Sequence, residues 1–437
     1  MVQYRASSYN YSIAEGRAVV LHNFLTKALI EVPASSRDVI EALLHDPDAN
    51  GSLDRDLFLL LLSQGFIIRS DINELDSIRY RYYASLLGGS NRTLRLAILP
   101  TMWCNFRCPY CFETRRHEFM QQETQSKLLE FADYKLTYAK ALCVAWFGGE
   151  PLLCKATIES LTKGFQQICA SRHCAYEAGI TTNGYLLDLD FIKSLEGMGV
   201  RSLQITFDGP PRHHDNYRAL PDGTGTFAII QKNAEDLCRL TPDDFHLLIR
   251  VNCSQNNLEE IPELLNLFSD QFRKKAKIFF RWIYPNESSG FKDFACGIPN
   301  HSKFTFLANL CQKATEVGWS VDSSVDSAPI YCEVDSTNFF QISPKGDVFL
   351  CSDSYKPEES IGNVHEWRKL VTPDFKWYAA NPFGDPDCLK CILLPYCMGG
   401  CRRARVLGHK SCVYELNDID SHVRVLYQSA LKQHVTT

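Results

Sequence analysis

The segment Cys104-Asn-Phe-Arg-Cys108-Pro-Tyr-Cys111 places three thiols on one short stretch of chain, separated by three and then two residues. A cubane iron–sulfur cluster is normally held by four cysteine thiolates. A segment that offers three therefore predicts a [4Fe–4S] cluster with one iron open to a substrate or cosubstrate. Zinc is the alternative, with His117 as a fourth ligand, although the paired Cys-x-x-Cys arms of many zinc sites are missing.

The composition supports metal binding. The chain has 437 residues, 18 of them Cys, and a formal net charge of −5. Its first residues lack the basic start and apolar run of a signal peptide, so we expect a cytoplasmic protein, in which structural disulfides are rare. Metal binding is then the leading explanation for the cysteines. The charge gives no footprint for nucleic acid, and no apolar run predicts a membrane span.

Residues 1–90 contain none of the cysteines and predict a small α+β domain. The expected elements are strands at 9–13, 17–21 and 65–68, an apolar stretch to Val32, and helices at 36–44, 54–62 and 72–86, with Ser35 or Ser36 and Asp54 as N-caps. This order resembles the winged-helix-like peptide-recognition domains of enzymes that modify ribosomally made peptides. The alternative is a structural cap that binds nothing.

A linker, Gly88-Gly89-Ser90-Asn91, precedes strands that alternate with helical segments, which is typical of βα units and a parallel sheet. The six expected strands are Leu94–Pro100, Cys143–Phe147, Tyr176–Thr181, Ser202–Phe207, His246–Asn252 and Lys277–Tyr284. Six units predict an open, partial barrel of the α/β class, with its active site at the carboxyl ends of the strands. The polar motifs follow these ends: the cysteine segment, Gly148-Gly149-Glu150-Pro151, Thr182-Asn183-Gly184 and Asp208-Gly209-Pro210.

The cysteine segment, with Tyr110 before its last cysteine, together with Gly-Gly-Glu-Pro after the next strand, resembles the radical S-adenosylmethionine (radical SAM) enzymes. The resemblance covers about residues 94–320. It implies that SAM chelates the open iron through its amino and carboxylate groups. An injected electron would then cleave SAM to a 5′-deoxyadenosyl radical, with a flavodoxin- or ferredoxin-type protein as the expected donor.

Several residues are candidates for holding SAM. Gly148 and Gly149 allow the backbone to approach a ligand closely, and the Glu150 carboxylate can accept hydrogen bonds from an ammonium. The resemblance implies further contacts to the cosubstrate from Tyr110, Asn183, Thr206 and Arg218. Arg250 is a weaker candidate, because with Asn252 it could instead form a hydrogen-bonded pair in the core. His213 and His214 fit loop structure better than metal ligation.

The carboxyl third contains a second cysteine pattern: Cys332, Cys351, then Cys388-x2-Cys391-x5-Cys397-x3-Cys401, and finally Cys412. Seven thiols are too many for one tetrahedral metal, and two zinc sites are the alternative. The pattern resembles the SPASM extension of radical SAM enzymes, which binds two auxiliary [4Fe–4S] clusters. The resemblance implies that Cys388, Cys391, Cys397 and Cys412 ligate the distal cluster, whereas Cys332, Cys351 and Cys401 hold the nearer one. That trio lacks a visible fourth ligand; Glu333, Asp335, Cys296 or a substrate thiol could complete it.

Three domains are therefore expected: 1–90 for peptide recognition, 91–320 for the radical SAM partial barrel, and 321–437 for the SPASM region. With three [4Fe–4S] clusters and SAM, the leading hypothesis is a maturase that installs a crosslink in a ribosomally made precursor peptide with a leader, with a thioether favoured over a carbon–carbon bond. One alternative is formylglycine formation, as in anaerobic sulfatase maturases, with Asp353 as base. In that family the Asp directly follows a cysteine, whereas here Ser352 intervenes after Cys351. A non-catalytic electron-transfer protein is the other.

Overall fold

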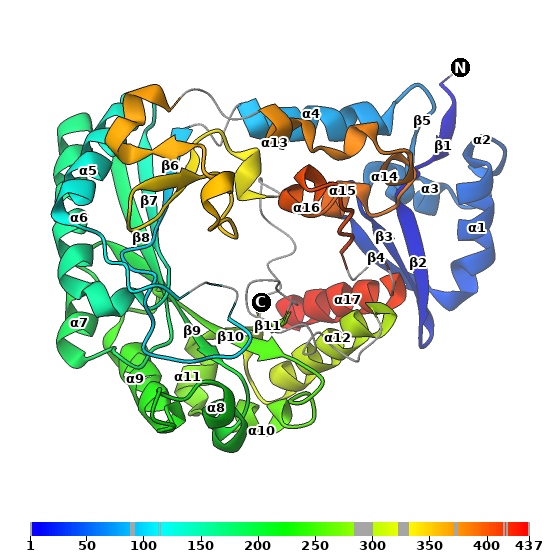
Figure 1. Cartoon of the computed structure of the whole chain (residues 1–437). Coiled ribbons are helices and arrows are strands. Elements are labelled where there is room, and N and C mark those ends of the chain that lie inside the picture. Colours follow the sequence, from blue (N-terminus) through cyan, green and yellow to red (C-terminus); the bar gives the residue numbers. More distant parts are fainter. Residues whose placement is uncertain are drawn as a thin grey trace. The chain divides into compact units, whose positions relative to one another are not determined.

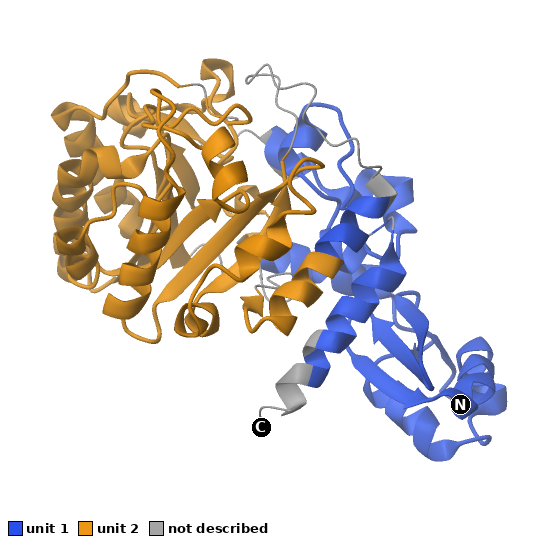
Figure 2. Cartoon of the chain, turned by 90° about the horizontal axis from the view of Figure 1, so that it is seen from below, with its two compact units in different colours: residues 1–85, 300–308, 376–437 blue, residues 86–299, 309–375 orange. Residues whose placement is uncertain are grey.

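The structure is a computed structural model that describes residues 2–87, 92–111, 113, 115–283, 300–321, 332–370, 375–413, 416 and 418–435. The chain forms two compact units, which are described separately (Figure 2). Unit 1 contains residues 1–85, 300–308 and 376–437, and unit 2 contains residues 86–299 and 309–375. The expected linker at residues 88–91 and Cys296 lie outside the described residues.

A ten-stranded sheet forms the centre of unit 2, in the order β12-β11-β10-β9-β8-β7-β6-β13-β14-β15. Its strands are β6 (Thr93–Ile98), β7 (Ala141–Trp146), β8 (Ala175–Thr182), β9 (Val200–Phe207), β10 (His246–Cys253), β11 (Lys277–Trp282), β12 (Ser320–Val321), β13 (Phe339–Ile342), β14 (Asp347–Phe349) and β15 (Gly362–Asn363). The run from β12 to β13 is parallel, and β14 and β15 are antiparallel. All six strands expected from the sequence are present, so the partial barrel is confirmed; β13 and β12 extend it.

Helices connect the strands and lie on the outer side of the sheet (Figure 1). They are α5 (Gln122–Leu136), α6 (Lys155–Arg172), α7 (Leu189–Ser194), α8 (Pro211–Tyr217), α9 (Phe227–Leu240), α10 (Ile261–Leu265), α11 (Asp270–Lys275) and α12 (Asn300–Glu316), whose first residues belong to unit 1.

The alternation of side chains along the strands explains why the sheet has two different faces. One face is apolar and fully buried: Leu94, Leu96, Ile98, Leu142, Val144, Trp146, Ile180, Leu203, Ile205, Phe207, Leu247, Ile249 and Val251. The other face has small and polar residues that are partly buried or exposed: Arg95, Cys143, Ala145, Glu177, Gly179, Thr181, Ser202, Gln204 and Arg250. The helices cover the apolar face, which leaves the polar face as the inner surface of the barrel.

Unit 1 contains the antiparallel sheet β2-β3-β4 and the pair β1-β5. The strands are β1 (Tyr4–Ala6), β2 (Asn10–Glu15), β3 (Ala18–Asn23), β4 (Leu29–Pro33) and β5 (Ile67–Arg69), and the helices are α1 (Arg37–His45), α2 (Pro47–Asn50), α3 (Arg55–Ser63), α4 (Glu74–Leu87), α13 (Phe375–Ala379), α14 (Pro386–Leu389), α15 (Leu394–Cys397), α16 (Arg402–Val406) and α17 (Ile419–Val435). One face of the sheet, with Val19, Leu21 and Val32, packs against residues of α1 and α3.

The predicted N-cap of α3 is confirmed, whereas the predicted serine N-cap of α1 is not. Asp54 caps α3, because its carboxylate accepts from the Leu57 N–H at 2.9 Å. Ser36 occupies the N-cap position of α1 but makes no capping hydrogen bond through its side chain. The serine prediction was therefore wrong in its chemistry: a 3-10 turn at Ala34–Ser36 leads directly into α1, so Ser36 is not in the extended conformation from which a hydroxyl reaches back.

Candidate functional site

The cysteine segment leaves the carboxyl end of β6, as the sequence predicted. Its base is fixed by Thr101, whose hydroxyl donates to the Glu118 carbonyl at 2.6 Å and accepts from the Trp103 N–H at 2.9 Å. Arg107 donates to the carbonyls of Cys104 and Phe106, both at 2.8 Å. Cys104, Cys108 and Cys111 are all half-buried. A single short loop thus holds three half-buried cysteines at the carboxyl end of β6.

The Gly148-Gly149 turn lies directly against this loop. The Gly149 N–H donates to the Thr101 carbonyl at 3.1 Å, and the Glu150 N–H donates to the Trp103 carbonyl at 2.9 Å. A Cβ atom on Gly149 would come closer than 3.0 Å to the Trp103 carbonyl, and Gly148 has a φ of +107°. The glycines therefore allow close approach between two segments of the chain itself, in addition to any approach to a ligand.

The buried Glu150 carboxylate joins its own turn to the end of β8. It accepts from the Thr182 hydroxyl at 2.6 Å, from the Asn183 N–H at 2.8 Å and from the Leu152 N–H at 3.0 Å. Burial raises the pKa of Glu150, and these hydrogen bonds oppose that rise. Oε1 takes two of the donors and Oε2 only one, so Oε2 keeps an acceptor position for a further donor.

Asn183 connects the end of β8 to the cysteine loop. Its side-chain amide donates to Asn105 Oδ1 at 2.7 Å, and its own Oδ1 accepts from the Tyr185 N–H at 3.0 Å. Because Asn105 follows Cys104 directly, this contact fixes the first cysteine relative to β8. Asn183 therefore lies beside the predicted cluster ligands, and its contact with SAM stays a prediction.

Tyr110 belongs to a polar network at the ends of β9 and β10. Its hydroxyl donates to the Asp208 carboxylate and accepts from Arg218 Nη1 at 2.9 Å. Asn252 donates to the other Asp208 oxygen at 3.2 Å. Burial is the main cause that raises the pKa of Tyr110 well above its ordinary value, so the phenol stays protonated. The sequence placed Asp208 at the carboxyl end of a strand and named Asn252 as a possible partner of Arg250, but it did not predict that both contact Tyr110.

Arg218 is the charged centre of this network. Its side chain is 92% buried, and its nearest carboxylate oxygen, Asp208 Oδ1, is 3.9 Å away. The buried Nε has no hydrogen-bond partner in the described part of the chain. Since an unpaired buried N–H of a cation is unfavourable, this geometry fits an anionic ligand beside Arg218.

The other two predicted SAM contacts lie on neighbouring strands. Thr206 on β9 is buried and is directly opposite Arg250 on β10. Arg250 Nε donates to Asn252 Oδ1 at 2.8 Å, which is the hydrogen-bonded pair that the sequence left open as the alternative. Asn252 also donates to Asp208, so Arg250 is connected to the network of Tyr110 and Asp208 through Asn252.

Asp353 lies near the cysteine loop in an acidic environment. Burial raises the pKa of Glu113 to about 8, and the charges of Glu150 and Asp353 add to this effect. Tyr355 has a pKa well above its ordinary value, first because of burial and then because of Glu113 and Asp353. Glu113 was not singled out from the sequence, and its Oε2 has no hydrogen-bond partner among the described residues.

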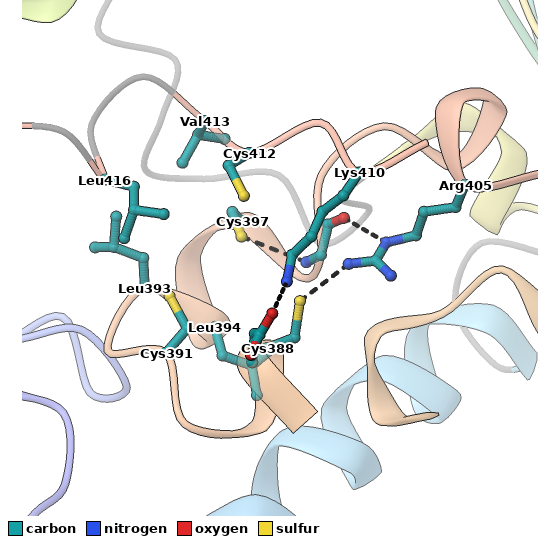
Figure 3. Close-up of a pocket in the computed structure, with 12 residues that line it drawn as sticks. Cys388, Cys391, Leu393, Leu394, Cys397, Arg405, Lys410, Cys412, Val413 and Leu416 are labelled. Carbon is teal, nitrogen blue, oxygen red and sulfur yellow. Dashed lines mark hydrogen bonds and ion pairs between the residues drawn. The ribbon is translucent and has the colours of Figure 1, made fainter. Parts of the chain in front are cut away.

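The seven carboxyl-terminal cysteines divide between the two units. Cys332 and Cys351 belong to unit 2, whereas Cys401 belongs to unit 1, so their grouping around one cluster stays a prediction. In unit 1, Cys388, Cys391, Cys397 and Cys412 line one cavity of about 80 Å³ (Figure 3). We refer to this cavity as the four-cysteine site. No three Cys, His, Asp or Glu side chains in the described ranges lie as one metal ion requires.

Hydrogen-bond donors surround the four-cysteine site. Arg405 Nη2 donates to Cys388 Sγ at 3.0 Å, and the Gly399 N–H donates to Cys397 Sγ at 3.4 Å (Figure 3). Lys410 contacts Asp385 and Asp387, both at 3.1 Å. Four thiols with cationic and amide donors fit an iron–sulfur cluster, whose thiolate sulfurs accept such hydrogen bonds.

Residues 98–268 match the model of the radical SAM superfamily. The chain contains a radical SAM domain. The matched residues run from the end of β6 past β10 and include the cysteine loop, Glu150, Asn183 and Arg218. Membership in this superfamily implies SAM and a [4Fe–4S] cluster as cofactors.

Curated relatives support the same assignment. The radical SAM cyclopropyl synthase TigE of Paramaledivibacter caminithermalis is 24% identical over 77% of this chain and 74% of its own length. The PqqA peptide cyclase of Rhodopseudomonas palustris is 23% identical over 68% of this chain and 79% of its own. A cysteine-type anaerobic sulfatase-maturating enzyme of Clostridium novyi is 25% identical over 69% and 85%. The chain is thus similar to radical SAM enzymes and peptide maturases over 68–77% of its length.

A solved structure shows the same fold. The anSMEcpe protein with bound AdoMet and a Kp18Cys peptide superposes with a TM-score of 0.62 at 19% identity, over 79% of this chain and all of that one. Among the described residues, no helix is long and apolar enough to cross a membrane.

Proposed function

We propose that this radical SAM enzyme is a maturase that installs a crosslink in a ribosomally made precursor peptide. The observation that carries the proposal is the network at the barrel mouth. There Glu150, Asn183 and Arg218 lie around the three-cysteine loop, which carries Tyr110. They offer one open acceptor and one cationic N–H that has no partner among the described residues.

These residues would bind different parts of SAM and its cluster. When bound, the cluster and SAM supply a 5′-deoxyadenosyl radical. Cys104, Cys108 and Cys111 would hold the cluster, and Oε2 of Glu150 would accept from the SAM ammonium. Arg218 Nε would donate to the SAM carboxylate, because a guanidinium matches a carboxylate in charge and geometry. Tyr110, which lies in the same loop as the three cysteines, would also contact the bound SAM.

The peptide part of the proposal rests on three supports. Relatives named above include a peptide cyclase and a sulfatase-maturating enzyme, and the solved structure of the same fold has a peptide bound. The partly accessible inner face of the barrel offers small and polar side chains. In unit 1, β2 and β4 are edge strands of a three-stranded sheet, and an extended leader peptide can pair with such an edge.

A thioether is the favoured crosslink. The cluster assigned to Cys332, Cys351 and Cys401 has three cysteines, and an open iron would bind a substrate thiol as thiolate. A substrate carbon radical captured by that sulfur would form the C–S bond, and the surplus electron would pass to the cluster. A fourth protein ligand that stays in place when a Cys-containing peptide binds would exclude this docking and favour a carbon–carbon crosslink.

Formylglycine formation is a second candidate because Asp353 lies near the cysteine loop. Its carboxylate is close enough to Glu113 and Tyr355 to affect both electrostatically. Incubation with a Cys-containing sulfatase peptide distinguishes the two reactions, because conversion of Cys to formylglycine replaces sulfur with oxygen and changes the peptide mass differently from the loss of two hydrogens on crosslinking.

The decisive test is anaerobic reconstitution followed by assay of 5′-deoxyadenosine. With three clusters, about twelve irons per chain are expected. Replacing Cys104, Cys108 and Cys111 with Ala should abolish SAM cleavage and leave about eight irons. Cys174→Ala is the matched control, because Cys174 is assigned to no cluster. SAM cleavage by the triple variant would refute the assignment, whereas a wild-type protein that binds iron but never cleaves SAM would favour a non-catalytic electron-transfer role.

A further inference from the structure

The four-cysteine site shares one hydrophobic core with the N-terminal sheet. Within unit 1, Cys388, Leu393, Leu394 and Met398 are buried together with residues from the first quarter of the chain. These partners are Tyr9, Ile13, Val20, Phe24, Leu25, Ile78 and Tyr82. The turns that supply the thiols therefore cover the face of β2 and β3 that α1 and α3 leave open.

Aromatic and cationic side chains join the same two regions. The Phe383 ring contacts the rings of Tyr82 and Tyr83 at centroid distances of 5.5 and 5.9 Å. Arg402 is fully buried; it donates to the carbonyls of Met398 and Gly400 at 2.8 and 3.1 Å, and its guanidinium lies 5.5 Å from the Tyr82 ring centroid. One buried cation thus fixes the Cys397–Cys401 turn against α4.

Helix α17 completes the cover of the sheet. Tyr11 donates to Asp420 at 2.7 Å, and Arg424 pairs with Glu15 at 3.0 Å. His422 stacks on Phe24 with ring centroids 6.0 Å apart. The segment between Cys412 and α17 is short, so the position of Cys412 constrains where this helix begins.

The thiol-bearing segments have little regular structure of their own. Helices α14, α15 and α16 have 4, 4 and 5 residues. Helices this short are unstable by themselves, because nucleation costs more than a few hydrogen bonds return. Ligation of four thiols by one cluster would fix these turns, and metal binding of this kind contributes directly to folding.

We propose that a cluster bound at the four-cysteine site stabilises the β2-β3-β4 sheet by fixing the turns that pack against it, so that the order of this sheet depends on iron. We call this structural role a metal staple. This inference rests on the cluster assignment in the proposed function. It gives this cluster a structural role in peptide recognition: loading fixes α14–α16, and these turns close the core beneath β2 and β3. By linkage, a stable N-terminal core must also strengthen retention of the cluster.

Hydrogen exchange of the intact, reconstituted protein tests the staple. In a variant with Cys397→Ser and Cys412→Ser, two thiols outside the shared core, backbone amides of residues 11–23 should exchange at least about tenfold faster than in the wild type, because the local opening free energy falls. The matched control is the variant with Cys104, Cys108 and Cys111 replaced by Ala, which lacks a different cluster and should exchange as the wild type does. Equal exchange in all three proteins would overturn the staple.

A reciprocal experiment leaves the cysteines intact. Val20→Ala, in the centre of β3, should lower iron by up to about four per chain and speed its loss to a chelator, since the shared core is weakened. Leu59→Ala, at a site that is 45% exposed on α3, is the control and should retain iron normally. Unchanged iron retention in Val20→Ala would contradict the linkage. SAM cleavage reports separately on the barrel, so failure of the proposed function is recognised independently.

Discussion

A single carboxylate organises the candidate SAM site at the residue scale. Glu150 accepts from three donors that come from two different strand ends, and the turn that carries it is hydrogen-bonded to the cysteine loop. Its burial would be costly without these donors. The same three hydrogen bonds orient the open acceptor position on Oε2 toward a further donor.

Glu150→Gln should therefore lower SAM cleavage by at least about tenfold. The amide keeps one acceptor oxygen but turns the other into a donor that faces donors, which costs roughly 1–3 kcal/mol. The measurement is the rate of 5′-deoxyadenosine formation together with the melting temperature. Glu159→Gln, on the exposed surface of α6, is the control. Wild-type cleavage by Glu150→Gln would show that this carboxylate does not position SAM.

Arg405 contacts the four-cysteine site through a hydrogen bond to a cysteine sulfur. Its N–H donor at 3.0 Å from Cys388 Sγ and its positive charge both favour the more negative, reduced state of a bound cluster. Arg405→Gln should lower the reduction potential of that cluster by roughly tens of millivolts, whereas Arg405→Lys should retain part of the effect. A spectroscopic redox titration measures this, with Arg239→Gln as a remote, exposed control. An identical potential in all variants would remove Arg405 from this role.

The sequence predicted the strands and loops that are encoded by local sequence patterns. Apolar runs located all six barrel strands, and the spacing of cysteines together with Gly-Gly-Glu located the cysteine loop and Glu150. Strand β13 was missed because it has only four residues and its partner, β6, is more than 200 residues away. The Tyr110–Asp208–Asn252 network was missed for the same reason: its members meet only when separate strand ends converge.

The Gly149 turn yields a prediction about two elements. A Cβ at this position would collide with the Trp103 carbonyl of the cysteine loop. Gly149→Ala should therefore displace the loop and lose about four of the twelve expected irons together with SAM cleavage. Gly197→Ala is the matched control, since a Cβ there meets only the Ser194 carbonyl at 3.6 Å. Full iron content in Gly149→Ala would show that the loop accommodates the added methyl.

The packing of β3 against α17 predicts acid sensitivity. Burial lowers the pKa of His22 from 6.5 to about 4 and that of His422 to about 3. Because both values are depressed, the unfolded state takes up protons first as the pH falls through 6.5. Stability is full above pH 6.5 and decreases toward pH 4, by on the order of 2 kcal/mol for each histidine at pH 5.

Exchange of the β3 amides at pH 7 and pH 5, corrected for intrinsic rates, measures this loss. His22→Gln should remove about half of it, and His45→Gln, at an exposed position on α1, should remove none. An equal loss in wild type and in His22→Gln would assign the acid sensitivity to other groups.

At the scale of the whole molecule, the two units divide the chain unevenly. Unit 2 contains the residues that match the radical SAM model. Unit 1 is assembled from three separate segments, so its core joins residues such as Val20 and Leu394 that are far apart in sequence. Sequence patterns locate strands and motifs but do not reveal that a shared core unites both ends of the chain. The proposed domains at 1–90 and 321–437 remain a prediction that this core now makes testable.

Deletion of residues 1–90 tests both the shared core of unit 1 and the proposed leader recognition. The truncation removes Tyr9, Ile13, Val20 and Phe24 from the shared core, which would expose Leu393, Leu394 and Met398 to water. The four-cysteine site should then lose its cluster, and iron should fall from about twelve to about eight per chain. SAM cleavage should persist, because the cysteine loop, Glu150 and Arg218 lie in unit 2 with a core of its own. The measurements are iron content and 5′-deoxyadenosine formation by the truncated protein.

A truncated protein that kept all its iron would show that residues 1–90 do not support the four-cysteine site. Peptide modification by that protein would further exclude them from leader recognition.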